Sequence, residues 1–381
     1  MTRLALLFTV LLTMGAAPAD RMEGTWIGEF QHNRWHQVTE SLWVTIRASA
    51  DGERHGFSTQ LPLKDLDGMA IAPGNSGKAD VTFTMRREAG EFVFTGQFVD
   101  ETGSGSFTFT TDDAYVRSMG RLGYANLTLS QVFTLAIHDV TIPFVEELGK
   151  LGYAGLPYDD LVAMRIHDVS PAFIRSLQAA GYRDIPKDDL MAMRIHGVTP
   201  EFIAEMAKAG FSDLSIDQLT AMRIHGVTPE FVAEMAKAGF PKLTVDNLVS
   251  ARIHGVTVAY IDEFSRAGYR SLTMDQLQAM RIHGVSPAFV RDLEALGYKR
   301  PDVDRLVALR IHGVSTEFIG GLADLGYRDV SLDRLVELRI HGVSERFIRE
   351  VKEAGYTPTL QQLIDMRIHG VDGVLLKTVR N

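Results

Sequence analysis

Residues 223–227 read Arg-Ile-His-Gly-Val, and close copies of this pentapeptide recur along most of the chain. Its histidine returns every 29 residues, with one final step of 28, so that nine of the 12 histidines belong to a single ladder. A fixed period of this length is typical of a solenoid, in which each unit buries its apolar face only against its neighbours. The ladder histidines are His138, His167, His196, His225, His254, His283, His312, His341 and His369.

The residues that follow each pentapeptide predict the first helix of a repeating pair. Thr199 is a favourable N-cap, and Pro200 suits the first helical position. Phe202, Ile203 and Met206 are expected to form an apolar stripe along this helix at helical spacing. Gly210 is expected to close the helix in the left-handed conformation, which costs glycine little.

The second helix of the pair is expected to begin at Ser215 and to end at His225. Ser215 and Gln218 match the capping box, in which two side chains satisfy the first free N–H groups of a helix. Gly226 then closes the helix before the next unit begins. The apolar contacts of this helix are assigned to Leu219, Met222 and Ile224.

Nine such pairs follow one another, and helices of about ten residues must be held by packing because they are marginal in isolation. The sequence therefore predicts an α+β protein with separate domains, in which a small antiparallel β domain precedes an all-α solenoid of about nine 29-residue helix pairs. The expected boundaries are 1–19 for a signal peptide, 20–112 for the β domain, 113–371 for the solenoid and 372–381 for a C-terminal cap or tail.

The region before the repeats reads as β-structure. Apolar and polar residues alternate at 41–47, 81–85, 92–98 and 106–110, and Thr, Phe and Val are frequent there. Such alternation is the strand signal. We expect six or seven short antiparallel strands in a small curved sheet, a sandwich or a partial barrel.

The N-terminus predicts export. Arg3 precedes an apolar run at 4–14 that is too short to span a bilayer, and 17–19 (Ala-Pro-Ala) fits cleavage after Ala19. We therefore expect a periplasmic or secreted protein with no membrane span in the mature chain. The net charge of −9 argues against nucleic acid as a partner, and the lack of cysteine excludes disulfides and thiolate chemistry.

The histidine ladder suggests a metal site, but its spacing favours a structural role. Equivalent residues on stacked helices lie at least one interhelical distance apart, about 8–10 Å. Imidazoles that share a zinc ion must each lie about 2 Å from it. A histidine at a helix C-terminus can instead interact with the free carbonyl groups and with the negative end of the helix dipole. We therefore expect no metal and no cofactor at the ladder.

An arginine stands two residues before most ladder histidines and allows two interpretations. The arginines could pair internally with acidic residues, which the acidic net charge favours, or they could form a stripe that binds an acidic partner or an anionic glycan. The candidate stripe is Arg165, Arg194, Arg223, Arg252, Arg281, Arg310, Arg339 and Arg367. The candidate internal partners are Asp159, Asp188, Asp217, Asp246, Asp275, Asp304 and Asp333.

The sequence contains no Ser-nucleophile elbow and no phosphate loop, so no catalytic residue and no cofactor is predicted. The leading hypothesis is a non-enzymatic scaffold or sensor-type module that binds a protein or peptide of the cell envelope through the solenoid surface. The alternative is small-molecule or glycan binding by the β domain, and a third hypothesis is a hydrolase. Positions that are invariant between repeats are expected to be structural, and variable positions to carry specificity.

Two resemblances bear on these hypotheses. The repeats, of the form Leu-x-x-Leu-Arg-Ile-His-Gly-Val-Thr-Pro-Glu-Phe followed by Ala-Gly-Tyr or Leu-Gly-Tyr, resemble extracytoplasmic regions of some bacterial sensor receptors of the zinc-metallopeptidase, β-lactam-sensor type. The likeness covers about 114–371, and the peptidase motif and membrane helices of those receptors are missing from this sequence. It implies an exported sensing or interaction module. Gly24-Thr25-Trp26 is similar to the start of lipocalin-type barrels, which implies a ligand-holding sheet.

Overall fold

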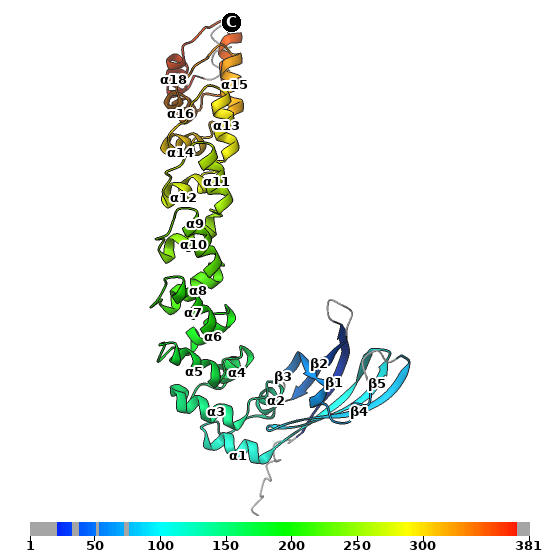
Figure 1. The fold of residues 1–381 in the computed structure, drawn as a ribbon. Coiled ribbons are helices and arrows are strands. Elements are labelled where there is room, and N and C mark those ends of the chain that lie inside the picture. The colour runs from blue at the N-terminus through cyan, green and yellow to red at the C-terminus, as the bar shows by residue number, and fades with distance from the viewer. Residues whose placement is uncertain (1–20, 33–37, 51–52, 72–75, 372–381) are drawn as a thin grey trace, which may run out of the picture. The chain divides into compact units, whose positions relative to one another are not determined.

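A computed structural model describes residues 21–32, 38–50, 53–71 and 76–371 (Figure 1). The expected signal peptide at 1–19 and the expected cap at 372–381 lie outside these ranges. The chain divides into two compact units, Met1–Ile195 and His196–Asn381. Within the described residues, the first unit holds a six-stranded sheet and α1 to α6, and the second holds α7 to α18.

The sheet is antiparallel throughout, with the strand order β3-β2-β1-β6-β5-β4. The prediction of a small antiparallel domain is confirmed, in the form of a single open sheet. Its strands of 10 to 13 residues are longer than the sequence alternation indicated. The strands are β1 (Arg21–His32), β2 (Val38–Ala50), β3 (Glu53–Pro62), β4 (Lys78–Arg87), β5 (Gly90–Val99) and β6 (Thr102–Thr111).

Aromatic side chains fill one face of the sheet. The Trp26 ring lies 5.3 Å from the Phe83 ring, measured between centroids, in an edge-on arrangement. Phe133 of α2 (Leu129–Ile137) lies 5.6 Å from Phe92 and 5.4 Å from Phe109. All five side chains are almost fully buried, so α2 closes this face and links the sheet to the helices that follow.

Eighteen helices of seven to ten residues follow the sheet in the described part of the chain, so the α-helical region begins two residues after β6 ends. None of them is long and apolar enough to cross a membrane. The helices of the first unit are α1 (Asp113–Arg121), α2, α3 (Ile142–Leu148), α4 (Tyr158–Ile166), α5 (Pro171–Ala179) and α6 (Lys187–Ile195). Those of the second unit are α7 (Pro200–Lys208), α8 (Ile216–Ile224), α9 (Pro229–Lys237), α10 (Val245–His254), α11 (Val258–Arg266), α12 (Met274–Ile282), α13 (Pro287–Ala295), α14 (Val303–Ile311), α15 (Thr316–Asp324), α16 (Leu332–Ile340), α17 (Glu345–Glu353) and α18 (Leu360–Ile368).

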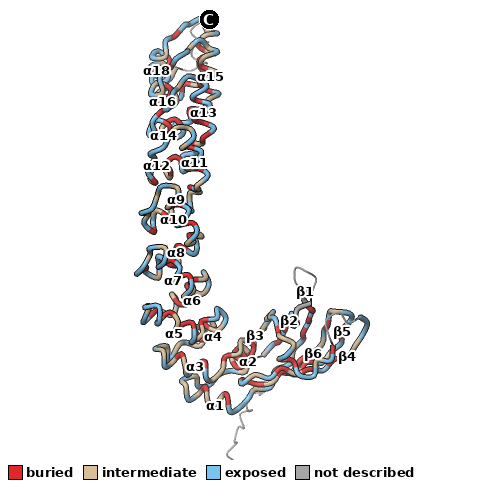
Figure 2. The backbone as a smooth tube through the Cα atoms, in the orientation of Figure 1, coloured by how far each residue is buried: buried red, intermediate tan, exposed pale blue. Residues whose placement is uncertain are grey.

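Within each unit, a helix packs on the helix two places along the chain. In the first unit α1 contacts α3, α3 contacts α5, and α4 contacts α6. In the second unit the even-numbered helices from α8 to α18 contact one another in series, and so do α13, α15 and α17. Buried segments recur in every pair (Figure 2), which is the packing of an α-solenoid.

The local signals of the repeat are confirmed. The Thr199 hydroxyl accepts a hydrogen bond from the N–H of Phe202, with Pro200 at the first helical position. Ser215 and Gln218 form the expected capping box. One assignment is wrong: Leu219 and Met222 are fully buried, but Ile224 is 52% exposed and makes no contribution to the core.

Candidate functional site

Each ladder arginine stacks on an aromatic ring near the start of the first helix of its pair. In α8, the guanidinium of Arg223 lies 4.9 Å from the centroid of the Phe202 ring, and its Nε donates a 3.4 Å hydrogen bond to the carbonyl oxygen of His196. The guanidinium of Arg281 likewise lies 4.7 Å from the centroid of the Tyr260 ring. All eight arginine–ring distances fall between 4.7 and 5.5 Å. The cation–π contacts therefore join the two helices of each pair, and the hydrogen bond from Arg223 to His196 joins that pair to the preceding one.

The glycine of each pentapeptide except the last makes room for the arginine of the next repeat. Gly226 has φ +66°, and a Cβ built there would lie 3.0 Å from Nη2 of Arg252. The same Cβ at Gly197 would lie 2.9 Å from Nη2 of Arg223. Glycine therefore permits both a left-handed backbone and a close approach by the guanidinium at this position.

Two ladder arginines in the first unit also form ion pairs, with aspartates that replace this glycine. Arg165 lies 3.2 Å from Asp139, and Arg194 pairs with Asp168. Both aspartates keep the left-handed backbone, with φ of 53° and 54°. In the described part of the second unit, none of the six ladder arginines has a carboxylate within 4 Å.

The aspartates at the starts of the second helices are therefore the wrong internal partners for the ladder arginines. Asp188 pairs with Lys187, and Asp333 pairs with Arg305. The physical reason is that the aspartates lie in the first turn of these helices and the arginines in the last turn. The aspartates remain well placed to interact with the positive end of the helix dipole.

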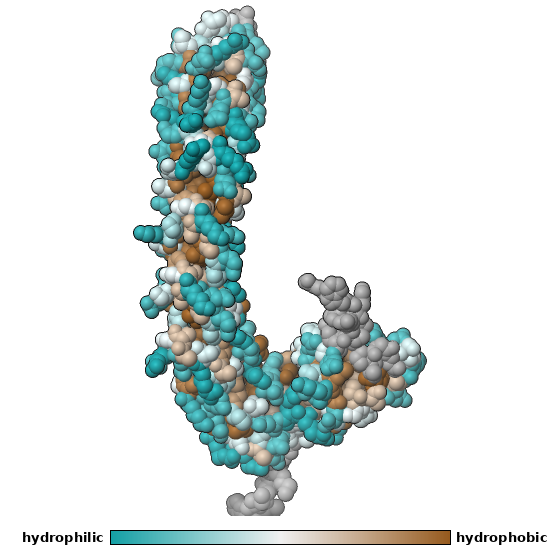
Figure 3. Space-filling model, in the orientation of Figure 1, coloured by the Kyte–Doolittle hydropathy of each residue, from teal (hydrophilic) through white to brown (hydrophobic). Residues whose placement is uncertain are grey.

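The isoleucine between the arginine and the histidine points to solvent in eight of the nine repeats. These side chains are exposed by 52 to 56%, whereas Leu219 and Met222 in the same kind of helix are fully buried. Hydrophobic residues accordingly reach the surface between hydrophilic ones along the helical pairs (Figure 3). We call this set the Ile ladder, and its members are Ile166, Ile195, Ile224, Ile253, Ile282, Ile311, Ile340 and Ile368.

The ladder histidines end or cap the even-numbered helices, as expected from their position before glycine. His225 is the C-cap of α8 and His312 is the C-cap of α14. Within the described residues, no group of three or more His, Asp or Glu side chains is arranged to hold a metal ion. The ladder thus supplies helix ends at a regular spacing along each unit.

The first repeat differs because the sheet of the same chain packs on it. Ile137 is only 8% exposed, and the ring of its neighbour His138 lies 5.7 Å from the ring of Phe57 in β3. Burial, and then the charge of Arg165, lowers the pKa of His138. The residue at the arginine position is Ala136, which is fully buried. In this repeat the isoleucine is therefore buried, and the sheet contacts the histidine that follows it.

The tyrosines after the helix-closing glycines connect consecutive pairs. The Tyr298 hydroxyl donates a 2.6 Å hydrogen bond to the carbonyl oxygen of Val330, and the Tyr153 hydroxyl donates to that of Ile185 at 2.7 Å. Tyr124, Tyr269 and Tyr327 make equivalent bonds. These hydroxyls are thus engaged within the protein, whereas Phe211 and Phe240 have none to offer.

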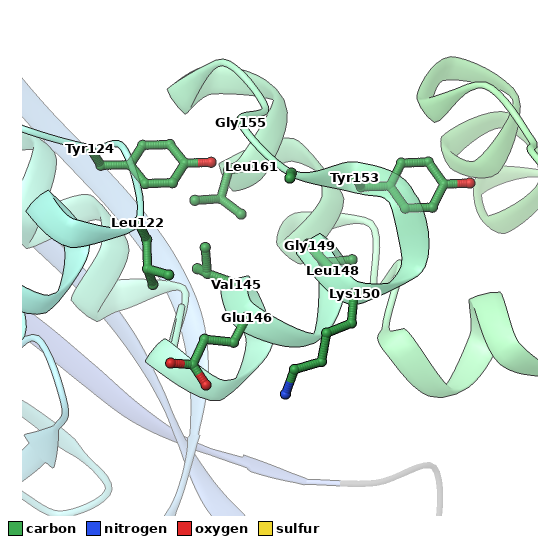
Figure 4. A pocket seen from close by; sticks show the side chains of 11 residues that line it. Leu122, Tyr124, Val145, Glu146, Leu148, Gly149, Lys150, Tyr153, Gly155 and Leu161 are labelled. Carbon is green, nitrogen blue, oxygen red and sulfur yellow. The ribbon is translucent and has the colours of Figure 1, made fainter.

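The hollows between pairs repeat along the chain. One of about 450 Å³ lies beside Tyr153, where Leu122, Val145 and Leu161 face one another and Lys150 points away (Figure 4). A second hollow of about 400 Å³ is lined by residues three repeats further on, including Phe211, Val232, Phe240 and Leu248. Recurrence of one shallow hollow is a consequence of repeat packing, and it differs from the single enclosed pocket typical of a small-molecule site.

The spacing of the motif thus predicts the arginines and histidines as candidate residues, whereas the exposure of the Ile ladder was not predicted from the sequence. Its signal was present, because isoleucine stands in all nine copies of the motif. No protein-family model and no curated protein matches the chain. The likeness of the repeats to receptor regions of the β-lactam-sensor type stays a prediction.

Proposed function

We propose that this chain is a non-enzymatic, exported scaffold that binds a protein or peptide of the cell envelope. The binding surface is the Arg-Ile stripe, which we define, within each unit separately, as the ladder arginines together with the Ile ladder. The observation that carries the proposal is the 52 to 56% exposure of the same apolar side chain in eight repeats. Large apolar side chains that recur in a row at the surface are typical of interaction sites.

The remaining surface features support a binding module over an enzyme. The two hollows beside Tyr153 and Phe240 recur with the repeat, and a catalytic centre needs a unique arrangement of groups. The aromatic face of the sheet is filled by its own side chains and by Phe133, so those rings serve the core. A row of equivalent contacts suits a long partner that touches several repeats at once.

Photo-crosslinking in cells tests the proposal. The photoreactive residue p-benzoylphenylalanine replaces Ile253 or Ile282 in separate variants, and the matched control replaces Leu296, which is 43% exposed and lies outside the stripe. We expect a discrete protein adduct from the two stripe positions and none from Leu296. Folded, exported variants that yield no adduct at either stripe position would contradict the proposal.

A further inference from the structure

The Ile ladder is unnecessary for the core of the repeats. In α12, Leu277 and Met280 are fully buried and Ile282 is 54% exposed. Isoleucine also has a lower helix propensity than leucine, methionine or lysine, because its branched side chain is restricted in a helix. A surface position chosen for solubility or helix formation would carry a different residue, so the retention of isoleucine points to a contact outside the repeats.

An arginine stands directly before each isoleucine of the Ile ladder, although the chain as a whole carries −9. In the second unit the guanidinium of Arg252 is held over the Phe231 ring at 4.8 Å, next to the exposed Ile253. Its only hydrogen bond within the described residues runs from Nε to the carbonyl oxygen of His225, at 3.4 Å. The Nη donors are therefore available, and an arginine offers five donors suited to carboxylates.

The covered first repeat indicates what kind of polypeptide fits over an arginine-bearing one. Ring contacts join β3 to its histidine-bearing helix, from His55 and Phe57 to Phe133 and from Phe57 to His138. In this repeat the arginine position is occupied by Ala136. Burying a guanidinium without a carboxylate is costly, and alanine avoids that cost. A cover over a repeat that keeps the arginine must therefore supply carboxylates to the guanidinium.

We infer that the Arg-Ile stripe of the second unit binds an acidic polypeptide segment whose apolar side chains cover the Ile ladder. This inference rests on the proposed function and names the chemistry of its partner. The apolar residues of the segment contact the isoleucines, and its Asp or Glu carboxylates accept hydrogen bonds from the arginine Nη groups. An anionic membrane fits less well, because each repeat offers only one apolar side chain for insertion into it.

Fluorescence anisotropy of the full chain with synthetic peptides tests the inference. The probe is a labelled eighteen-residue peptide of repeating Glu-Ile-Thr, long enough at about 3.3 Å per residue to cross several repeats. Matched probes of repeating Lys-Ile-Thr and Glu-Ser-Thr remove the acidic charge or the apolar side chain. We expect each matched probe to bind at least about tenfold more weakly, and the acidic probe to weaken steeply with added sodium chloride.

A variant of the protein provides a second test, independent of the choice of peptide. Replacement of Ile224, Ile253, Ile282 and Ile311 with serine leaves the buried core unchanged and should weaken binding of the Glu-Ile-Thr probe by at least about tenfold. Leu296→Ser is the control and should bind like the unmodified protein. Equal binding of the Glu-Ile-Thr and Lys-Ile-Thr probes would overturn the inference without any variant.

Three further outcomes would also overturn it. They are equal affinity of the serine variant, binding to phosphatidylglycerol vesicles in place of the peptide, and isoleucine-dependent self-association with no peptide binding. The crosslinking experiment separates this failure from failure of the proposed function. Adducts at Ile253 with no binding of the acidic probe would leave the scaffold function standing and dismiss only the acidic partner. Absence of both would dismiss the two together.

Discussion

The guanidinium of Arg252 lies 4.8 Å from the centroid of the Phe231 ring, and this contact places one arginine in two roles. The guanidinium lies over the ring, which holds the side chain between neighbouring helices. The Nη groups stay at the edge of the stripe, beside the exposed Ile253. The arginine that holds the repeat together thus also sets the charge of the surface on which we propose that a partner binds.

The stack predicts that lysine cannot replace this arginine. Arg252→Lys keeps the charge but loses the planar contact and the Nε hydrogen bond to His225, so we expect a destabilisation of about 0.5–1 kcal/mol. The urea dependence of far-ultraviolet circular dichroism measures it. Arg266→Lys is the matched control, because Arg266 is exposed on α11 and stacks on no ring within the described residues. Equal effects of the two substitutions would show that the stack contributes nothing.

The pentapeptide glycine should distinguish alanine from aspartate. Gly226→Ala places a Cβ 3.0 Å from Nη2 of Arg252 at a φ of +66°, and the left-handed backbone alone costs alanine about 1–2 kcal/mol. Gly226→Asp should be tolerated better, because Asp139 adopts the same conformation and pairs with the arginine of the next repeat, Arg165. Urea unfolding of the two variants decides, and an aspartate variant less stable than the alanine variant would refute this account.

The positions at which the helices of each repeat begin and end could be predicted from sequence, because capping residues and glycines act locally. Thr199, Ser215 and Gly226 each specify a helix end through their own backbone or side chain, and the structure confirms all three. The assignment of Ile224 to the core is wrong because a hydrophobic side chain need not be buried. At 3.6 residues per turn Ile224 lies about 200° around the helix from Met222, which places it on the opposite side.

The partner of the arginines could not be predicted for a different reason. Cation–π stacking depends on two residues 21 positions apart, such as Arg223 and Phe202, and on the packing that brings them together. Charge counting favours a carboxylate partner and contains no information on an aromatic one. The cover over Ile137 likewise depends on the tertiary contact between α2 and the sheet. Spacing along the chain carries no signal for either contact.

The tyrosine hydrogen bonds predict opposite effects of two substitutions. Tyr298→Phe removes the 2.6 Å bond to the carbonyl oxygen of Val330 and should cost about 0.5–1.5 kcal/mol. Phe240 stands at the equivalent position two repeats earlier, so Phe240→Tyr should add the missing bond and raise stability by about 1 kcal/mol or less. Unfolding midpoints in urea test both, and the pair controls for the size of the ring. A destabilising Phe240→Tyr would show that the carbonyl is out of reach there.

His138 predicts that the contact between α2 and the sheet weakens in acid. Burial, followed by the charge of Arg165, lowers the pKa of His138 below its ordinary value of 6.5, so the folded protein binds this proton less readily than the unfolded chain. The contribution is therefore fully present above about pH 6.5 and is lost as the pH falls through the lowered value. All three tryptophans precede residue 44, so tryptophan fluorescence during urea unfolding reports on the sheet.

His138→Gln removes the titrating group and keeps a polar side chain beside Phe57, whose ring lies 5.7 Å from that of His138. We expect the unmodified protein to lose more stability between pH 7.5 and pH 5.5 than the glutamine variant does. Only the unmodified protein has a side chain here that binds a proton more readily in the unfolded chain than in the folded protein. The difference between the two pH profiles isolates His138 from the other titrating groups. Parallel profiles would mean that the ring of His138 is as well solvated in the folded protein as in the unfolded chain.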